Sequence, residues 1–206
     1  MKERHYNGEG LPLVESFYTI QGEGYNTGKA AYFIRLAGCD VKCGWCDAKQ
    51  TWNSLKYKAV SVDDIVKRVL ETPARYVVIT GGEPLKYNLD PLCARLRERG
   101  LKIFLESSGT EPLSGKFDWI CLSPKRKKPP LEEIYANADE IKVIIEEESD
   151  FEWAEDNRRR VSKECRLYLQ PEWSRAREML PVIIEFVKRN PEWEISLQTH
   201  KFMEIP

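Results

Sequence analysis

Three cysteines lie within eight residues of this 206-residue chain, and their spacing constrains its fold and chemistry more than any other feature. Cys39, Cys43 and Cys46 follow a C-x3-C-x2-C pattern, so one short loop must hold all three thiol groups close together. A structural zinc site normally has four protein ligands, whereas a catalytic metal centre keeps one coordination position open. Iron–sulfur clusters are normally held by four thiolates. A cluster held by only three would leave one iron free to bind a ligand from outside the protein.

The cysteine loop allows two other interpretations at this point. Zinc is the commoner metal at cysteine ligands, and either His5 or His200 could supply a fourth ligand. The pair Cys43 and Cys46 also has the C-x2-C spacing of thioredoxin-like redox proteins. Such a redox pair does not need a third cysteine nearby. We therefore favour the iron–sulfur cluster over both alternatives.

Short apolar runs alternate with segments of helical pattern along most of the chain. Predicted strands occupy residues 32–36, 77–79, 103–105, 119–122, 141–145, 167–169 and 195–199, and most end in a polar or glycine-rich turn. Predicted helices occupy residues 62–70, 91–99, 151–160 and 174–189. Ser61 and Asp90 are expected to cap the first two helices, Gly100 to end the second, and Pro181 to bend the last. This alternation predicts a parallel α/β sheet with ligands at the carboxyl ends of its strands.

The composition narrows the possible functions. The chain has 32 Lys and Arg against 33 Asp and Glu, and a net charge of −1 argues against a nucleic-acid binder. Residues 1–5 are not of the secretory type, and no segment approaches the ~20 apolar residues of a membrane span. We expect a cytoplasmic protein of one domain over residues 1–206. The remaining cysteines, Cys93, Cys121 and Cys165, are expected to be buried as small hydrophobic side chains.

A second motif, Thr80-Gly81-Gly82-Glu83-Pro84, follows the predicted strand 77–79. Its glycines permit close approach of the backbone to a ligand, and Glu83 supplies a negative charge. The cysteine loop, with Trp45 directly before its last cysteine, resembles the cluster loop of the radical S-adenosylmethionine (SAM) superfamily. The glycine-rich turn resembles the SAM-binding motif of the same superfamily. The resemblance implies a 4Fe–4S cluster on Cys39, Cys43 and Cys46, with SAM bound at the free iron.

Further segments narrow this resemblance. Residues 18–24 (YTIQGEG), Arg35, residues 123–125 (SPK) and residues 198–201 (QTHK) resemble the 7-carboxy-7-deazaguanine synthase family. The resemblance implies an α/β fold with an incomplete (βα)6-type partial TIM barrel, a mostly parallel sheet and a homodimer. It also implies conversion of 6-carboxy-5,6,7,8-tetrahydropterin (the carboxypterin) to 7-carboxy-7-deazaguanine by radical ring contraction with loss of ammonia, a step toward queuosine. A flavodoxin- or ferredoxin-type protein would supply electrons.

The same resemblance assigns ligand contacts to this chain. The carboxypterin would contact Ile20, Gln21, Gly22, Glu23, Arg35, Thr80 and Pro206, the last through its terminal carboxylate. SAM would be lined by Trp45, Cys46, Asp47, Gly82, Glu83, Glu106, Ser123, Pro124, Lys125 and Gln170. No side chain is expected to be catalytic, because SAM and the cluster carry the radical chemistry. The residue types suit these roles, since a guanidinium pairs with a carboxylate through two parallel hydrogen bonds.

One position departs from the family pattern. Members commonly carry Thr after the Asp of the cluster loop, and the Thr hydroxyl ligates a Mg2+ that also touches the substrate. Ala48 follows Asp47 here and has no ligand atom. Mg2+ keeps several waters and needs few protein ligands, so it could still bind through substrate and water. Thr51 is a candidate to replace the missing hydroxyl.

Two rival functions follow from the same cysteine loop. The first is a radical SAM activase that installs a glycyl radical on a partner enzyme. Such an activase needs no pterin pocket, so Gln21, Glu23 and Arg35 argue against it. The second is a zinc-stabilised binding protein without catalytic activity. Iron and zinc can be told apart by the colour of the reconstituted protein.

Overall fold

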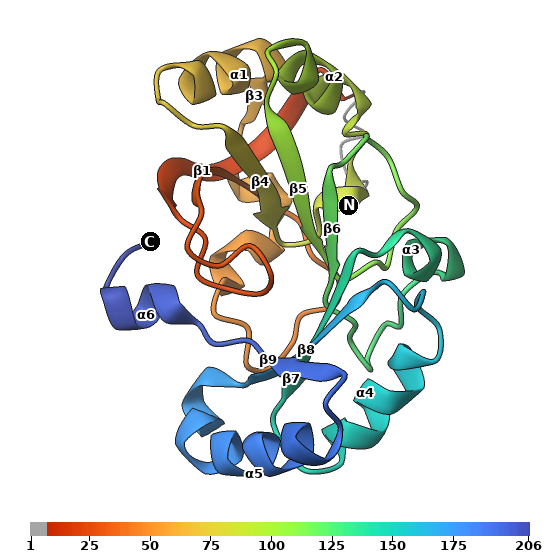
Figure 1. Ribbon diagram of the computed structural model, residues 1–206. Coiled ribbons are helices and arrows are strands. Elements are labelled where there is room, and N and C mark those ends of the chain that lie inside the picture. The colour runs from red at the N-terminus through yellow and green to blue at the C-terminus, as the bar shows by residue number, and fades with distance from the viewer. Residues whose placement is uncertain (1–7) are drawn as a thin grey trace.

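The computed structural model describes residues 8–206, and its centre is a nine-stranded sheet in the order β3-β1-β2-β4-β5-β6-β7-β8-β9 (Figure 1). Seven strands form a parallel array: β2 (Ala30–Leu36), β4 (Tyr76–Gly81), β5 (Lys102–Ser107), β6 (Trp119–Leu122), β7 (Glu140–Ile145), β8 (Arg166–Pro171) and β9 (Trp193–Ile195). At one edge, β1 (Gly10–Ile20) runs antiparallel to both of its neighbours, β2 and β3 (Ala59–Ser61). Because β3 and β9 do not pair, the barrel is open. This confirms the α/β fold with a partial barrel and a mostly parallel sheet.

Helices connect most of the parallel strands and lie outside the sheet (Figure 1). They are α1 (Val62–Leu70), α2 (Asp90–Glu98), α3 (Glu132–Asn137), α4 (Asp150–Arg158) and α5 (Ala176–Arg189), followed by the short α6 (Thr199–Met203). Ser61 caps α1 as predicted, because its Oγ accepts a hydrogen bond from the Asp64 backbone N–H at 3.1 Å. Ile65, Val66 and Val69 then turn the apolar face of α1 into the core. Among residues 8–206, no helix has both the length and the apolar character to cross a membrane.

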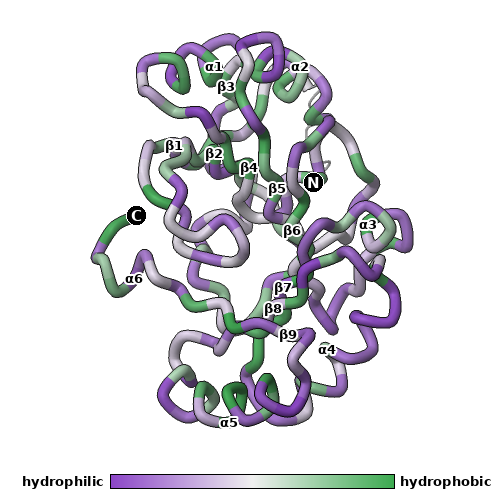
Figure 2. The backbone as a smooth tube through the Cα atoms, in the orientation of Figure 1, coloured by the Kyte–Doolittle hydropathy of each residue, from purple (hydrophilic) through white to green (hydrophobic). Residues whose placement is uncertain are grey.

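The two faces of the sheet serve different purposes, because successive residues of a strand point to opposite sides. Ile34, Ile79 and Leu105 lie side by side in register and are fully buried in the main core. Arg35 and Thr80, each the next residue along, are also paired in register and line the inside of the open barrel. In Figure 2 the central strands are mostly green, whereas α4 is mostly purple. On the same face as Arg35 and Thr80, Ala31, Val78 and Phe104 form a second buried apolar cluster, and the polar groups follow toward the carboxyl ends of the strands.

Several local predictions were wrong. The predicted strands and helices did not include β1, β3 or α3. Asp90 does not cap α2; the Asn88 side chain accepts from its backbone N–H, and the Asp90 carboxylate accepts from Gly115 N–H at 2.7 Å. Gly100 does end that helix, with a φ of +74° that suits glycine. The predicted strand 195–199 is also wrong, because β9 ends at Ile195 and α6 begins at Thr199.

Candidate active site

A cavity of about 570 Å³ opens at the carboxyl ends of the parallel strands. Its lining comes from the cysteine loop after β2, the glycine-rich turn after β4, the ends of β5 to β8, the loop after β1 and the C-terminal segment. All seven residues expected to contact the carboxypterin line it: Ile20, Gln21, Gly22, Glu23, Arg35, Thr80 and Pro206. So do the three loop cysteines and eight of the ten residues expected to line SAM: Trp45, Cys46, Asp47, Gly82, Glu106, Ser123, Lys125 and Gln170.

The cysteine loop is held against the rest of the protein by its backbone. Gly38 N–H donates to Thr51 O at 2.5 Å, and the Glu83 N–H donates to Gly38 O at 2.7 Å. Gly82 faces this loop so closely that an added Cβ would lie 2.4 Å from Gly38 O and 2.9 Å from Cys39 Cβ. A side chain at position 82 would therefore push the two motifs apart. This explains in physical terms why the turn after β4 carries glycine there.

The loop residues fit an iron–sulfur cluster better than a zinc ion. Among residues 8–206, no three His, Cys, Asp or Glu side chains converge on one point as a single-ion site requires. A 4Fe–4S cluster binds each thiolate to a different iron, so its thiolates need only surround one cavity. Cys39, Cys43 and Cys46 meet this condition, since all are free, half-buried and exposed to the same cavity. Of the two histidines considered for zinc, His200 belongs to no such group, and His5 lies outside the described residues.

Two further side chains, Lys125 and Trp52, lie at the cavity wall near the cysteine loop. Burial raises the pKa of the Cys43 thiol, and the nearby Lys125 ammonium opposes that effect by favouring the thiolate. Lys125 lies 5.2 Å from the centre of the Trp45 ring, which fixes its side chain over the loop. Trp52 also lines the cavity, and its buried indole N–H has no hydrogen-bond partner within residues 8–206. An unsatisfied buried donor is unusual in a folded protein.

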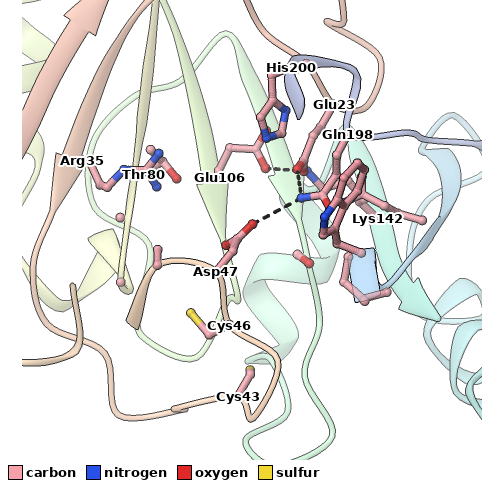
Figure 3. Close-up of a pocket in the computed structure, with 18 of the residues that line it drawn as sticks. Glu23, Arg35, Cys43, Cys46, Asp47, Thr80, Glu106, Lys142, Gln198 and His200 are labelled. Carbon is pink, nitrogen blue, oxygen red and sulfur yellow. Dashed lines mark hydrogen bonds and ion pairs between the residues drawn. The ribbon is translucent and has the colours of Figure 1, made fainter. Parts of the chain in front are cut away.

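Polar side chains from distant segments meet inside the barrel (Figure 3). Lys142 Nζ lies 2.6 Å from Glu23 Oε2 and 3.1 Å from Glu106 Oε2. Gln21 Nε2 donates to the other oxygen of Glu106 at 3.2 Å. Gln198 Nε2 donates to Glu23 at 2.8 Å and lies 3.3 Å from a carboxylate oxygen of Asp47. Burial alone would raise the pKa of Glu23, but Lys142 and Gln198 lower it to about 2, so this carboxylate is ionised.

The C-terminal segment is docked against the loop after β1. The backbone N–H and the hydroxyl of Thr199 both donate to Gly22 O, at 2.9 Å and 3.0 Å. An added Cβ at Gly22 would lie 2.4 Å from His200 Nδ1, so only glycine permits this approach. Ile205 N–H donates to His200 O at 3.1 Å, which turns the last residues back to the cavity. Pro206, the last residue, thereby reaches the cavity lining.

Two residues expected to line SAM lie elsewhere. Glu83 is fully buried and absent from the cavity wall. One of its carboxylate oxygens accepts from the Ser107 hydroxyl and the Leu85 N–H, and the other from the hydroxyl and N–H of Ser108. This carboxylate therefore ties the turn after β4 to the end of β5, and it has no oxygen left for an ammonium group. Pro124 is buried behind Ser123 and Lys125, which do reach the cavity.

Thr51 does not replace the hydroxyl missing at Ala48. Its side chain is fully buried, and its Oγ1 donates to Ala48 O at 2.7 Å. The hydroxyl therefore stabilises the turn of the short helix Lys49–Trp52 and points to protein backbone. Neither residue fits the role of a Mg2+ ligand.

Three residues of the cavity wall, Glu15, Trp52 and Lys142, had no predicted role. A signal existed for Lys142, because a charged residue interrupts the apolar run of β7, and lysine is almost never fully buried unless it is paired. Glu15 gave a weaker signal as an acid within the alternating pattern of β1. Nothing local marked Trp52. Gln198 and His200 belong to the segment 198–201 that carries the family resemblance, but neither had an expected contact with the carboxypterin or SAM.

Comparison with known proteins places this geometry in a family. The Radical SAM superfamily model matches residues 33–120, from within β2 to within β6. The 7-carboxy-7-deazaguanine synthase of Flavobacterium psychrophilum is 50 % identical over 199 residues, covering 97 % of this chain and 94 % of that protein. The synthase of the same name from Synechocystis is 46 % identical over 194 residues, covering 94 % and 93 %.

A solved structure has the same architecture. The crystal structure of QueE from Escherichia coli matches with a TM-score of 0.83 at 33 % sequence identity, covering 91 % of this chain and 93 % of that chain. This chain belongs to the 7-carboxy-7-deazaguanine synthase family of the radical SAM superfamily.

Proposed function

We propose that this protein is a radical SAM lyase that converts 6-carboxy-5,6,7,8-tetrahydropterin to 7-carboxy-7-deazaguanine with loss of ammonia, in 7-deazapurine (queuosine) biosynthesis. The observation that carries the proposal is a single cavity lined by all three loop cysteines and by all seven residues expected to contact the carboxypterin. Cofactor and substrate can therefore meet in one cavity. Family members at up to 50 % identity carry the name of this activity.

Cys39, Cys43 and Cys46 would hold the 4Fe–4S cluster, and Asp47, Gly82, Glu106, Ser123, Lys125 and Gln170 would surround SAM beside Trp45. When bound, the cluster and SAM would supply the radical hydrogen-transfer chemistry of the reaction. The protein positions the reactants and excludes water. Gly82 permits the close approach of backbone to ligand, and Lys125 provides a cation beside the cysteine loop. Buried Glu83 keeps the turn after β4 rigid.

The carboxypterin would bind between the loop after β1 and the C-terminal segment. Arg35 has N–H groups for the substrate carboxylate, and a guanidinium can grip it with two parallel hydrogen bonds. Glu23, kept ionised by Lys142, can accept hydrogen bonds from the pterin ring. The terminal carboxylate of Pro206 has two oxygens that suit the amino-pyrimidinone edge. These groups bind and orient the substrate, and none of them needs to transfer a proton.

Several finer features belong to the same proposal. We infer that the protein works in the cytoplasm as a single-domain homodimer and takes electrons from a flavodoxin- or ferredoxin-type protein. Any Mg2+ would be held by substrate and water, because Ala48 has no ligand atom and the Thr51 hydroxyl is engaged. We assign Mg2+ no step in the reaction.

The decisive experiment is anaerobic turnover of the reconstituted protein with SAM, dithionite and the carboxypterin, followed by chromatography and mass spectrometry. We expect 7-carboxy-7-deazaguanine and ammonia to accumulate while SAM is not consumed in proportion. The C43A variant is the matched control and should form no product. If SAM were cleaved while the carboxypterin stayed unchanged, the glycyl-radical activase would be the better interpretation. A colourless protein that contains zinc would instead favour the binding protein.

A further inference from the structure

Lys142 is a buried cation at the centre of the cavity wall. Its side chain is 4 % exposed, and its Nζ pairs with Glu23 at 2.6 Å and with Glu106 at 3.1 Å. A buried charge is costly unless it is both paired and hydrogen-bonded, and these two carboxylates satisfy both conditions. Within residues 8–206, they are the only ion pairs of Lys142.

The two carboxylates approach Lys142 from different elements. Glu23 lies in the loop after β1, and Glu106 lies near the end of β5. In Figure 3 both point into the same part of the cavity, with Gln198 beside Glu23. Under the proposed function they belong to different ligands, since Glu23 is assigned to the carboxypterin and Glu106 to SAM. Lys142 therefore stands where the two binding regions meet.

A third carboxylate near Lys142 has partners of its own. Glu140, two residues earlier on β7, accepts hydrogen bonds from the Tyr25 N–H, the Trp119 indole and the Cys121 thiol. Burial would lower the pKa of Lys142, but Cys121, Glu106, Glu23 and Glu140 together raise it well above its usual value. Lys142 is thus a fixed positive charge, and its hydrogen bonds are directed to Glu23 and Glu106.

We propose that Lys142 is a positioning residue that joins Glu23 and Glu106 in one ionic bridge, so that the carboxypterin and SAM regions depend on a single shared cation. The proposal rests on the proposed function for the identity of the two ligands. It predicts that loss of Lys142 weakens the binding of both ligands, whereas loss of Glu23 or Arg35 weakens mainly the binding of the carboxypterin. Without Lys142, two buried carboxylates would repel one another and leave their positions.

Equilibrium binding to the cluster-reconstituted protein, measured for SAM and carboxypterin separately and without reductant, tests the bridge. We expect K142M to raise both dissociation constants by about tenfold or more. K142R keeps the cation and should recover part of both affinities. R95M is the matched control, because Arg95 also pairs with two carboxylates, Glu9 at 2.8 Å and Asp63 at 3.0 Å, but lies outside the cavity and away from the cysteine loop. It should leave both affinities unchanged.

A double-mutant cycle separates the bridge from a general packing effect. If Lys142 acts through Glu23, K142M/E23Q should bind carboxypterin within about twofold of E23Q alone. Its SAM affinity should still fall below that of E23Q, since Glu106 has lost its cation. K142M/E23Q removes one charge of each sign. The comparison of K142M/E23Q with E23Q therefore tests the bridge even if K142M alone does not retain its cluster.

Two results would overturn the bridge. The first is wild-type affinity of K142M for either ligand. The second is a fold-loss of carboxypterin affinity in K142M/E23Q that equals the product of the fold-losses in K142M and in E23Q. Failure of the proposed function gives a different result. A wild-type protein that binds no carboxypterin, or forms no product from it, contradicts the proposed substrate. The SAM measurements on K142M and E23Q would still test the ionic bridge in that case.

Discussion

The guanidinium Nε of Arg35 lies 2.7 Å from a carboxylate oxygen of Glu15, across an irregularity in the pairing of β1 with β2. Leu13 pairs with Leu36 and Glu15 with Arg35, so Val14 is an extra residue between them. Such a β-bulge re-aims the side chains that follow it, and here it places an acid opposite the arginine at the cavity wall. Glu15 occupies Nε, which leaves the two terminal nitrogens of Arg35 for a ligand.

We expect R35A to weaken carboxypterin binding far more than SAM binding. A charge-assisted hydrogen bond contributes ~1.5–3 kcal/mol, which corresponds to an increase of roughly 10- to 100-fold in the dissociation constant. E15Q should have a smaller effect, since half-exposed ion pairs contribute less than about 1 kcal/mol. Isothermal calorimetry on the two ligands measures both effects, with R97A, whose partner Asp118 lies outside the cavity, as control. Equal losses for both ligands would indicate a structural role for Arg35.

Replacing any one of Cys39, Cys43 or Cys46 by Ala should abolish SAM cleavage, because each thiolate anchors a different iron. Iron content and absorption near ~400 nm report the cluster directly. Ala at Cys93, Cys121 or Cys165 should keep the iron and lose only packing, since these thiols are buried away from the loop. The assignment fails if C121A loses its iron while C39A retains it.

Chelation of Mg2+ should change the carboxypterin dissociation constant of the wild type by less than about tenfold, or ~1.4 kcal/mol. The physical reason is that Ala48 has no ligand atom and the Thr51 hydroxyl donates to a backbone carbonyl. A48T restores a hydroxyl at the cavity wall and should gain a larger response to Mg2+. A wild type that needs Mg2+ as strongly as A48T would show that another group on this chain ligates the ion.

Extending the chain beyond Pro206 by even one residue should weaken carboxypterin binding by about tenfold or more, because the terminal carboxylate becomes a peptide bond. The segment before it is fixed by Thr199 on Gly22 and by Ile205 on His200, so the end cannot simply move aside. Iron content and SAM cleavage without substrate should be unaffected, and an amino-terminal tag is the control. Full activity with a C-terminal hexahistidine tag would contradict this role.

Acid should remove the contribution of Glu23 to stability. Burial alone would raise its pKa, but Lys142 and Gln198 lower it from 4.5 to about 2 in the folded protein. A carboxyl whose pKa falls on folding stabilises the protein above its unfolded pKa, and this stabilisation is lost as pH falls from about 4.5 toward 2. The difference in unfolding free energy between wild type and E23Q should therefore shrink by roughly 1 kcal/mol between about pH 6 and about pH 4.

Urea titrations of the cluster-free protein at several pH values measure this difference. E164Q removes the same charge from an exposed position and serves as control. A difference that grows as pH falls would mean that Glu23 is destabilised by burial and that Lys142 does not compensate it.

Local amino-acid pattern was enough to locate most of the parallel strands and both motifs. Apolar runs such as 77–79 and 103–105 are strands because they can be buried on a central sheet, and the turns after them must then gather at one edge. The cysteine spacing and the glycine-rich turn depend on residues adjacent in the chain, so local pattern was sufficient. Nearly all the residues expected at the cavity do line it.

Which side chains face one another depends on how distant segments pack in the folded protein. Lys142 is 119 positions from Glu23, and Gln198 is 175 positions from it, so no local pattern predicts either contact. Glu83 illustrates the same limit: its position in the turn suggested a ligand contact, but the end of β5 supplies donors that fill its carboxylate. Residues 196–199 suit a strand, yet the bonds from Thr199 to Gly22 start a helix there. A strand's own residues decide which of its faces is buried, whereas the curvature of the whole open barrel decides what lies opposite the other face.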